Sequence, residues 1–534
     1  MHTECYPISI LPRLSRLFID YAASREPLAP FYSAAPYGQD GQERAEHRGG
    51  SYAAIADLLK AQNRGFGASE AAFENIAKLH AGAPAIVTGQ QVTLFGGPLF
   101  TLLKAATVIR KARDAGAVPI FWMATEDHDL AEADHVTLPS RHELHRLRLE
   151  NGAEDSGRPV GGVRLGEGIR PLLEQAAELL GPGAALDALE AAYRPEASYA
   201  EAFGRFLAAV FADEGLILID AAGREFHRLG EPVLRAAIER AAELEDLLLA
   251  RTRLLEERGY ASQVLVVKGG SLLFLMDEET GARQALKRKG EVWVSGRKQF
   301  STTELLDILE SAPERLSPNA LLRPVFQDAI LPTAAYVGGP AEIAYFAQSQ
   351  VLYEANLDRK TGGRTTPVLP RLSATLVEPA MAKLLAQHEI SVPDLISTQP
   401  EEMAQRLGAR AMPTEGKRKL AAAGNALDEE LTSLTEWMRR LDAGLGKSAE
   451  VAARKMQYQM GRLRQLAANH QLQTEASLRR HVDALYLNLF PERHPQERVV
   501  GATAFLARYG EKLVSDLVEA AGTECPGHRV IWLD

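Results

Sequence analysis

The apolar positions in the first quarter of the chain follow two patterns, continuous runs typical of buried strands and a spacing typical of helices. Residues 84–88 form a short β-branched run before Gly89, and residues 118–124 form a second apolar run. Between them, residues 99–113 space their apolar side chains three and four positions apart, and Pro98 precedes the first turn. That spacing and that start indicate a helix. The pattern therefore predicts strand, glycine-rich turn, helix and strand, which is the building unit of a parallel sheet.

Further elements are expected on both sides of this unit, from the start of the chain to about residue 344. We expect helices over most of residues 1–80, over 202–211 and over 231–258. We expect strands at 215–220, within the basic stretch 283–300, and in a hairpin of 263–267 with 272–276 around a glycine turn. Residues 329–344 predict strand, loop and helix. Together these elements predict an α/β fold with a parallel-sheet core.

The C-terminal part of the chain has a different pattern. From about Asp394 it is rich in Ala, Leu, Glu, Arg and Gln, and apolar side chains from Leu427 to Leu445 alternate spacings of four and three. This is the seam of a coiled coil, which serves either oligomerisation or internal packing. Glycines at 444 and 446 interrupt it before a second helix, so we expect an antiparallel helical hairpin. Residues 529–533 predict a strand that returns to the core.

Composition narrows the range of functions. The 534 residues exceed the roughly 250–300 that one core accommodates, so we expect several domains. A net charge of −10 argues against a nucleic-acid-binding protein. We find neither a signal-peptide pattern nor an apolar run long enough to span a membrane, and we expect a soluble, cytoplasmic protein. Cys5 and Cys525 lack metal-ligand or CxxC spacing, so we expect two ordinary free thiols.

The loop after the first predicted strand is the first candidate site. Ligands of open α/β sheets bind beyond the carboxyl ends of strands, and glycines there let the backbone approach an anion at a helix N-terminus. The spacing matches neither GxGxxG nor GxxxxGK[ST], which excludes a dinucleotide or P-loop fingerprint. Two interpretations stay open. Either the glycines serve tight turns only, or the loop binds an anion through Gly89, Gln90, Gln91, Gly96 and Gly97.

The second candidate site follows the second predicted strand. Residues 125–129 read Thr-Glu-Asp-His-Asp, so Glu126, Asp127, His128 and Asp129 cluster at the mouth of a strand. Such a group could orient an amine, hold Mg²⁺ through oxygens or act as a base. The spacing of His128 and His135 is not HExxH, so no zinc site is predicted. A solvated acidic turn is the alternative, but the position at a strand end favours a functional role.

The third candidate site spans residues 317–342. An arginine there could clamp a carboxylate or phosphate, while amide, hydroxyl and carboxylate side chains could bind a polar ligand. A second glycine-proline helix opening, Gly338-Gly339-Pro340, repeats the one at 96–98. Ordinary capped helices and a surface ion pair are the alternative. The candidate residues are Asn319, Arg323, Gln327, Asp328, Thr333, Tyr336, Gly338, Gly339 and Glu342. The basic run Lys287-Arg-Lys289 is a weaker phosphate candidate.

These segments together resemble one protein family. VTGQQVTLFGGPLFTLLKA at 87–105, PIFWMATEDHDLAEADHV at 119–136 and SPNALLRPVFQDAILPTAAYVGGPAEIAYFAQ at 317–348 resemble the bacillithiol biosynthesis cysteine-adding enzymes, BshC. PVLPRLSATLVE at 367–378 and the coiled-coil region agree with that likeness. The resemblance covers nearly the whole chain.

The resemblance implies a domain plan and an activity. The plan is a Rossmann-like core over 1–393 with inserted connecting elements at approximately 140–310, a helical coiled-coil domain over 394–500 that mediates homodimerisation, and a segment over 501–534 that returns to the core. The implied reaction joins L-cysteine to glucosaminyl-malate and yields bacillithiol. Amide formation from a carboxylate is uphill, so ATP with Mg²⁺ is the chemical expectation, although neither a HIGH nor a KMSKS signature is present.

Roles for the candidate residues follow from this expectation. Arg323 would bind the malyl carboxylates, the helix openings at 89–98 and 338–340 would receive anionic groups, and Glu126, Asp127 or Asp129 would hold an ammonium group. His128 would move a proton, and no metal ligands are assigned. Two other functions stay open: a different ATP-dependent ligase or nucleotidyltransferase on the same core, and a coiled-coil scaffold that senses a metabolite.

Overall fold

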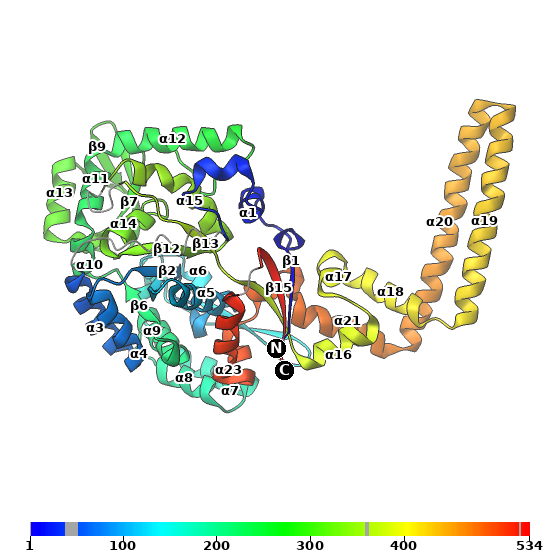
Figure 1. The fold of residues 1–534 in the computed structure, drawn as a ribbon, viewed down its shortest axis with the longest axis horizontal. Helices are drawn as coiled ribbons and strands as arrows, with labels where there is room; N and C mark the ends of the chain where they lie inside the picture. The colour runs from blue at the N-terminus through cyan, green and yellow to red at the C-terminus, as the bar shows by residue number, and fades with distance from the viewer. Residues whose placement is uncertain (1, 38–51, 358–362, 523–524) are drawn as a thin grey trace. The chain divides into compact units, whose positions relative to one another are not determined.

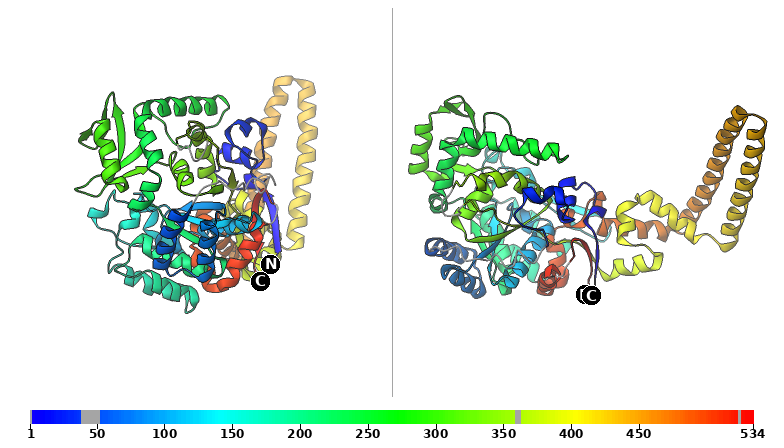
Figure 2. Two further views of the ribbon diagram at one scale, coloured as in Figure 1. Left: turned by 60° about the vertical axis from the view of Figure 1, so that its left-hand side comes forward. Right: turned by 45° about the horizontal axis from the view of Figure 1, so that its top comes forward.

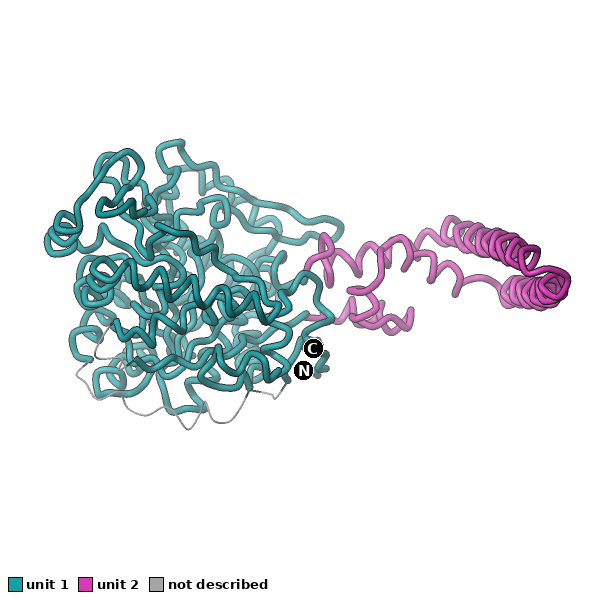
Figure 3. The backbone as a smooth tube through the Cα atoms, turned by 90° about the horizontal axis from the view of Figure 1, so that it is seen from above, with its two compact units in different colours: residues 1–375, 495–531 teal, residues 376–494, 532–534 magenta. Residues whose placement is uncertain are grey.

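A computed structural model describes residues 2–37, 52–357, 363–522 and 525–534. The chain divides into two compact units (Figure 3). One comprises residues 1–375 and 495–531, and the other comprises residues 376–494 and 532–534. The first unit carries the sheets and the second is mainly helical. The predicted fold class, a Rossmann-like α/β core with a C-terminal coiled coil, is confirmed.

A five-stranded parallel sheet forms the centre of the first unit (Figure 1). Its order is β13 (Val368–Pro370), β12 (Thr333–Gly338), β2 (Ala85–Gln90), β3 (Val118–Met123) and β6 (Ile217–Asp220). The chain runs outward from β2 to β3 and β6 on one side, and β12 and β13 lie on the other. The strand order therefore reverses at β2, which is where ligands of such sheets bind.

The central strands read as apolar runs because helices cover them. Every residue of β3 is buried, and α5 (Phe100–Asp114) packs on β2, β3 and β12. The helices α3 (Ala53–Phe66) and α4 (Glu70–His80) pack on β6, and α4 also contacts β3. Strands buried on both faces lose the alternation of half-exposed strands. The strand–helix–strand unit predicted over residues 84–124 is confirmed.

A second, antiparallel sheet corrects one prediction. Its order is β10 (Lys298–Phe300), β9 (Val292–Ser295), β8 (Arg283–Lys289), β7 (Gly270–Met276) and β11 (Leu316–Pro318). The strand-rich character of 283–300 is confirmed, but the hairpin of 263–267 with 272–276 is wrong because β7 pairs with β8. Residues 263 and 264 are instead held by the side-chain amide of Gln348, which accepts from both of their backbone N–H groups at 3.0 and 2.9 Å.

Two helix predictions also change. The helix expected at 231–258 is two helices, α11 (Glu231–Glu239) and α12 (Ala241–Glu257), which meet at Arg240. The backbone leaves helical geometry there, with φ −107° and ψ 19°. The helical prediction for 1–80 holds for α1 (Arg16–Ala22), α3 and α4 but is wrong for β1 (His2–Pro7). Part of that range, residues 38–51, lies outside the described residues.

The second unit contains the predicted helical hairpin. The helices α19 (Thr414–Leu441) and α20 (Ala443–Thr474) lie side by side in every view (Figures 1 and 2). The reversal occurs at Asp442, whose side chain accepts from the N–H of Leu445 at 2.8 Å and caps α20. Leu445 therefore belongs to the second helix. Further helices, α16 (Pro379–His388), α17 (Val392–Ser397), α18 (Pro400–Ala411) and α21 (Ala476–Leu489), complete this unit.

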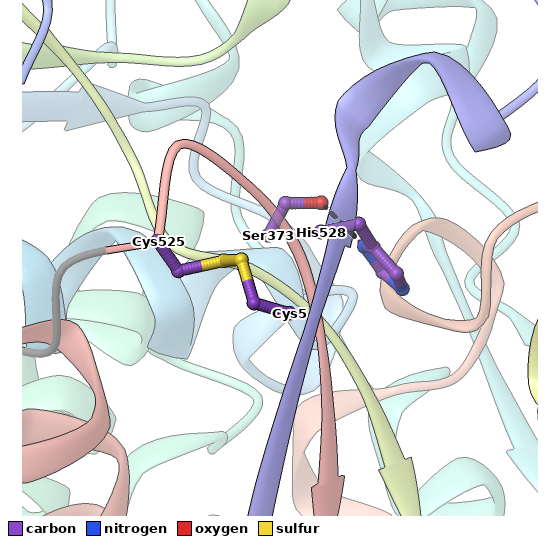
Figure 4. Close-up of a disulfide and its surroundings, with 4 residues drawn as sticks. All are labelled: Cys5, Ser373, Cys525 and His528. Atoms are coloured by element: carbon purple, nitrogen blue, oxygen red, sulfur yellow. Dashed lines mark hydrogen bonds between the residues drawn. A yellow bond between two sulfur atoms is a disulfide. The ribbon is translucent and has the colours of Figure 1, made fainter.

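The two cysteines form a disulfide, which corrects the prediction of free thiols (Figure 4). The strand predicted near 529–533 is confirmed as β15 (Gly527–Trp532), and it lies between β1 and β14 (Ser373–Val377) in a three-stranded sheet. Cys5 lies in β1 and Cys525 stands just before β15, so their Cα atoms are 5.9 Å apart across 520 positions of sequence. Nothing in the local spacing of either cysteine could indicate this pairing.

In the described part of the chain, none of the helices combines the length and the apolar composition that a transmembrane helix needs.

Candidate functional site

A cleft of about 770 Å³ opens at the carboxyl ends of β2, β3 and β12. This is the point where the order of the parallel strands reverses, as expected for a ligand site on such a sheet. The loops after β2 and β3, the start of α15 (Pro340–Glu354) and the second sheet all contribute side chains. The cleft thus brings together parts of all three segments that the sequence singled out.

Acidic side chains gather where β3 ends. Asp127 is held by three donors: its Oδ2 accepts from Nε2 of Gln91 at 2.5 Å, and its Oδ1 accepts from the N–H groups of His128 and Asp129 at 2.7 and 3.2 Å. Glu126 and Glu132 line the same part of the cleft. Because backbone donors fix the Asp127 carboxylate, this end of the cleft presents an oriented negative charge.

An arginine from the second sheet faces the acids. Arg283, the first residue of β8, donates to Oγ of Ser317 and to the carbonyl of Pro318, both at 2.8 Å, and its guanidinium lies 3.8 Å from the ring centroid of Phe274. Burial lowers the pKa of Arg283, although Glu126 and Asp127 oppose that shift. Its Nη1 lies 3.4 Å from Nδ1 of His128, and because a guanidinium only donates, Nδ1 is the acceptor.

A buried ionic network occupies the floor between β2 and β12. Nζ of Lys104 lies 2.5 Å from Oε2 of Glu342 and donates to the carbonyl of Gly89 at 2.6 Å. Glu342 also accepts from the hydroxyl of Tyr336 at 2.5 Å and from the N–H of Gly339 at 2.7 Å. Burial lowers the pKa of Lys104, against the opposing effect of Glu342. Burial would raise the pKa of Glu342, but Lys104, Tyr336 and the N–H of Gly339 together outweigh it and the pKa is lowered, which favours the carboxylate.

Arg323 is tied into the same network. Its guanidinium donates to the hydroxyl of Tyr345, to that of Tyr336 at 3.4 Å and to Oε1 of Gln327 at 3.3 Å. Burial raises the pKa of Tyr345 to about 12, although Arg323 opposes it, so the tyrosine is a neutral partner. Hydrogen bonds within the protein therefore occupy much of the donor capacity of Arg323.

Two further arginines line the cleft beside the start of α15. Arg371, which follows β13, forms a two-point ion pair with Glu497, with distances of 2.6 and 3.1 Å. Arg498, in α22 (Gln496–Val499), lines the cleft, and its guanidinium makes no hydrogen bond or ion pair with the other described residues. Burial lowers the pKa of Arg498, as does the positive charge of Arg371, while Glu497 opposes this shift. Arg498 is thus a cation that a bound anion could satisfy.

Eleven of the eighteen predicted site residues line the cleft. They come from all three predicted segments: Gly89, Gln90, Gln91, Glu126, Asp127, His128, Asn319, Arg323, Tyr336, Gly339 and Glu342. The remaining seven do not line it: Gly96, Gly97, Asp129, Gln327, Asp328, Thr333 and Gly338. Lys287 and Lys289 of the basic run are exposed on β8, and Arg288 pairs with Glu245 at 2.9 Å, also away from the cleft.

The two glycines at 96 and 97 serve packing. Both have positive φ, 79° and 71°, and a side chain at Gly96 would collide with the ring of Phe206, while one at Gly97 would collide with Thr93. The N–H of Gly96 donates to the hydroxyl of Tyr193 at 2.9 Å. Packing accounts for both glycines and favours the turn interpretation, while the expectation that this helix opening receives an anion stays a prediction.

The other residues outside the cleft have structural positions. Asp328 is buried and accepts from the hydroxyls of Tyr353, at 3.0 Å, and Thr366, and it also accepts from Gln327 at 3.2 Å. Thr333 begins β12 and so lies at the opposite end of that strand from the cleft. Gly338 packs against Glu342, and Asp129 is exposed at the start of α6 (Leu130–Ala133).

Four cationic side chains in the cleft were not among the predicted residues: Lys104, Arg283, Arg371 and Arg498. Lys104 had a usable signal, because it lies on a helix whose residues 101–109 are all buried. A lysine inside such a run needs a partner. The arginines gave no such signal, because their elements reach the cleft only through tertiary contacts.

Two family models together match nearly the whole sequence. The model described as "Bacillithiol biosynthesis BshC, N-terminal Rossmann-like domain" matches residues 1–372, and that described as "Bacillithiol biosynthesis BshC, C-terminal coiled-coil domain" matches residues 374–533. The chain belongs to the BshC family. The resemblance noted from the sequence is thereby confirmed.

Full-length relatives support the same membership. A protein of Koribacter versatilis is 41% identical over 99% of this chain and 100% of its own length. Proteins of Solibacter usitatus and Symbiobacterium thermophilum are 34% and 33% identical, and they cover 99% and 100% of this chain and all of their own length. Each is named "Putative cysteine ligase BshC". Membership places the chain among ligases of bacillithiol biosynthesis.

Proposed function

We propose that this BshC-family protein joins L-cysteine to glucosaminyl-malate through an amide bond and so forms bacillithiol. The names of its relatives support cysteine ligation. The choice of glucosaminyl-malate as the acceptor rests on the residues of the cleft. Glucosaminyl-malate carries an amine at one end and two carboxylates at the other. A matching site needs acids and cations at separate places.

The observation that carries the proposal is the separation of charge within one cleft. Glu126, Asp127 and Glu132 stand near the end of β3, whereas Arg371 and Arg498 stand beside the start of α15. Lys104 and Arg371 are each neutralised by a buried glutamate, so Arg498 is the cation best able to bind a substrate carboxylate. We therefore assign Arg498, ahead of Arg323, to the malyl carboxylates, and the acids to an ammonium group.

ATP with Mg²⁺ is the proposed source of carboxyl activation, since amide formation from a free carboxylate is uphill. The opening at residues 96–98 does not fit a phosphate, because packing fills it. The start of α15 fits better, because Gly339 lines the cleft beside Arg371 and Arg498. In the described residues no group of three or more His, Cys, Asp or Glu side chains is placed to hold a metal ion, so Mg²⁺ would arrive with the nucleotide.

Mass spectrometry tests the reaction directly. Purified protein is incubated with glucosaminyl-malate and cysteine, with and without Mg-ATP. We expect the bacillithiol mass only with Mg-ATP, and AMP or ADP then identifies the bond that is cleaved. A panel of other amine acceptors run alongside tests the alternative ligases. No product with glucosaminyl-malate, or preferred use of another amine, would overturn the proposed acceptor.

A substitution at Arg498 tests the assignment of the carboxylate end. We expect Arg498→Gln to raise the KM for glucosaminyl-malate about tenfold or more and to leave the KM for cysteine nearly unchanged, since a lost charge-assisted hydrogen bond is worth roughly 1.5–3 kcal/mol. Arg141→Gln, at an exposed arginine outside the cleft, is the matched control. An unchanged KM for glucosaminyl-malate in Arg498→Gln would contradict the assignment.

Two further features of the proposal concern the whole protein. We propose a homodimer that forms through the hairpin of α19 and α20, whose exposed apolar residues include Leu434, Trp437 and Leu441. The cytoplasmic location stays a prediction, which cell fractionation would test.

A further inference from the structure

A buried histidine lies directly behind the acidic wall of the cleft. His227, in α10 (Arg224–Leu229), is 0% exposed, and its Nε2 lies 3.0 Å from Oε1 of Glu126. The ring packs against Phe326, with centroids 5.5 Å apart. Glu126 itself lines the cleft. The imidazole therefore contacts the inner side of a carboxylate whose outer side is available to a ligand.

The hydrogen bonds of the ring fix the number of protons on it. Nδ1 lies 3.2 Å from the backbone carbonyl of Gly223, and because a carbonyl only accepts, Nδ1 carries a hydrogen. Nε2 makes no aligned hydrogen bond, but it lies 3.0 Å from a carboxylate oxygen, which also only accepts. Without a second proton on the ring, an unprotonated nitrogen would lie against this carboxylate oxygen inside the protein. We therefore assign a proton to each ring nitrogen, which makes His227 a positively charged imidazolium beside the Glu126 carboxylate.

The surrounding charges agree with that assignment. Burial alone would lower the pKa of His227, but Glu126, the carbonyl of Gly223 and Glu314 together outweigh it and the pKa is raised. The other groups that face this region are Asp220 at the end of β6, Glu314 with its partner Arg224, and Arg283 from β8. Burial raises the pKa of Asp220. Glu126 is thus the anion in direct contact with the histidine.

We propose that His227 is a positioning residue whose imidazolium, anchored on the carbonyl of Gly223, holds Glu126 aimed into the cleft as the carboxylate that binds the ammonium group of the substrate. This inference rests on the proposed function for the identity of the ammonium ligand. The pairing itself does not depend on it. Of the three acids near the end of β3, Glu126 is thereby singled out, and its free oxygen becomes the ammonium acceptor.

The sign of the pH dependence follows from the raised pKa. Below that pKa, His227 is protonated and the pair is intact. As the pH rises through it, the ring loses its proton and with it the positive charge beside Oε1, and Glu126 is no longer held. Binding of the ammonium group should therefore weaken on the alkaline side in the protein that carries His227.

Nuclear magnetic resonance of the histidine rings, on the full chain without substrate, tests the pairing. With ¹⁵N-labelled histidine and His227→Gln to assign the signal, we expect both ring nitrogens of His227 to be protonated at pH 7.5. In Glu126→Gln the carboxylate is gone, and we expect a neutral ring with its proton on Nδ1. Glu225→Gln removes an exposed carboxylate from the same helix and should leave the signal unchanged. A neutral His227 in the unmodified protein, or one unaffected by Glu126→Gln, would overturn the pairing.

Kinetics test the positioning role. His227→Phe fills the space beside Phe326 with an apolar ring, and we expect it to raise the KM for the amine acceptor about tenfold or more with a smaller change in kcat. His227→Gln keeps an amide donor and should restore most of the loss and flatten the alkaline rise in KM. Equal effects of the two variants would show a merely structural role and overturn the proposal. If the resonances behave as expected but no acceptor reacts, the proposed function fails while the pairing stands.

Discussion

Arg371 and Glu497 show how single residues hold the cleft wall in place. Both side chains are at most 4% exposed, and they meet through two hydrogen bonds of 2.6 and 3.1 Å. Glu497 also accepts from the N–H of Ala374 at 2.8 Å, and Arg371 donates to the carbonyl of Leu372 at 2.7 Å. Arg371 lowers the pKa of Glu497 against the opposing effect of burial. The pair therefore joins α22 to the segment after β13 and stays ionised.

Breaking this pair should cost more stability than breaking an exposed one. We expect Glu497→Gln to lower the free energy of unfolding by about 3–5 kcal/mol, because it leaves the Arg371 guanidinium buried beside a neutral amide. Denaturant unfolding of the first unit, followed by tryptophan fluorescence, measures the change. Glu519→Gln removes the exposed partner of Arg110 and should cost about 1 kcal/mol or less. Equal losses in the two variants would contradict the argument.

For single residues, the sequence predicted which side chains lie at the cleft better than it predicted which side chains contact each other. The residues that flank strand ends, such as Gln91, Glu126 and Asp127, could be placed at the cleft because the βαβ pattern fixes which loops follow the strands. Gly96 stands in the same loop but is held by contact with Phe206, more than a hundred positions away. His227 gave no signal at all, since its partner Glu126 lies on a different element. Proximity of that kind depends on tertiary packing, which no local spacing encodes.

For helices and strands, the apolar pattern along the chain gave correct predictions where an element buries a complete face. The strands β2 and β3 and the helix between them have long apolar patterns, and all three were predicted from these. The predicted strand at 263–267 was wrong although it is rich in valine. Leu265 in that segment is 82% exposed and its neighbours are held by Gln348, so no sheet partner is present there. An apolar run alone cannot show whether a strand is available to pair with it.

The hairpin of α19 and α20 exposes more apolar surface than internal packing explains. Trp437 and Leu441 on α19 are 50% and 59% exposed, and Tyr458 and Leu466 on α20 are 65% and 58% exposed. Leu431 and Met460, by contrast, are only 9% exposed. Exposed apolar patches of this kind usually mark contact surfaces. The predicted seam therefore serves internal packing at some positions and leaves others, such as Leu434 and Leu441, exposed.

We predict that charges on the exposed positions dissociate the proposed homodimer. The double variant Trp437→Glu with Leu441→Glu places carboxylates in the expected interface, and light scattering coupled to size exclusion should then give the mass of one chain in place of two. Glu429→Gln, on the exposed surface of the same helix, should leave the dimer mass unchanged. A dimer that survives the double variant, or an unmodified protein that is monomeric throughout, would refute this interface.

At the scale of the whole molecule, the Cys5–Cys525 disulfide and the sheet it flanks join the two ends of the chain. The strand β15 lies between β1 and β14, and His528 on β15 contacts the hydroxyl of Ser373 on β14 at 2.9 Å (Figure 4). The same ring contacts the hydroxyl of Thr375, also at 2.9 Å. Burial lowers the pKa of His528 to about 4, so the ring is neutral near pH 7. Ser373 also donates to Glu497, at 3.3 Å, so the sheet supports the wall of the cleft from behind.

The disulfide closes a loop that contains nearly every residue of the chain, so its loss should destabilise the protein as a whole. A native disulfide typically contributes about 2–5 kcal/mol, mainly through the unfolded chain, and more for longer loops. We expect Cys5→Ser to lower the melting temperature by several degrees, and we expect dithiothreitol to lower that of the unmodified protein to a similar value. Dithiothreitol should leave Cys5→Ser unchanged, which separates the bond from any other effect of reductant. Peptide mapping without reduction identifies the linked fragments.

If the bond formed only in an oxidising solution, protein trapped with alkylating agent inside cells would show two free thiols. If it forms where the enzyme works, the trapped protein would contain the linked peptides.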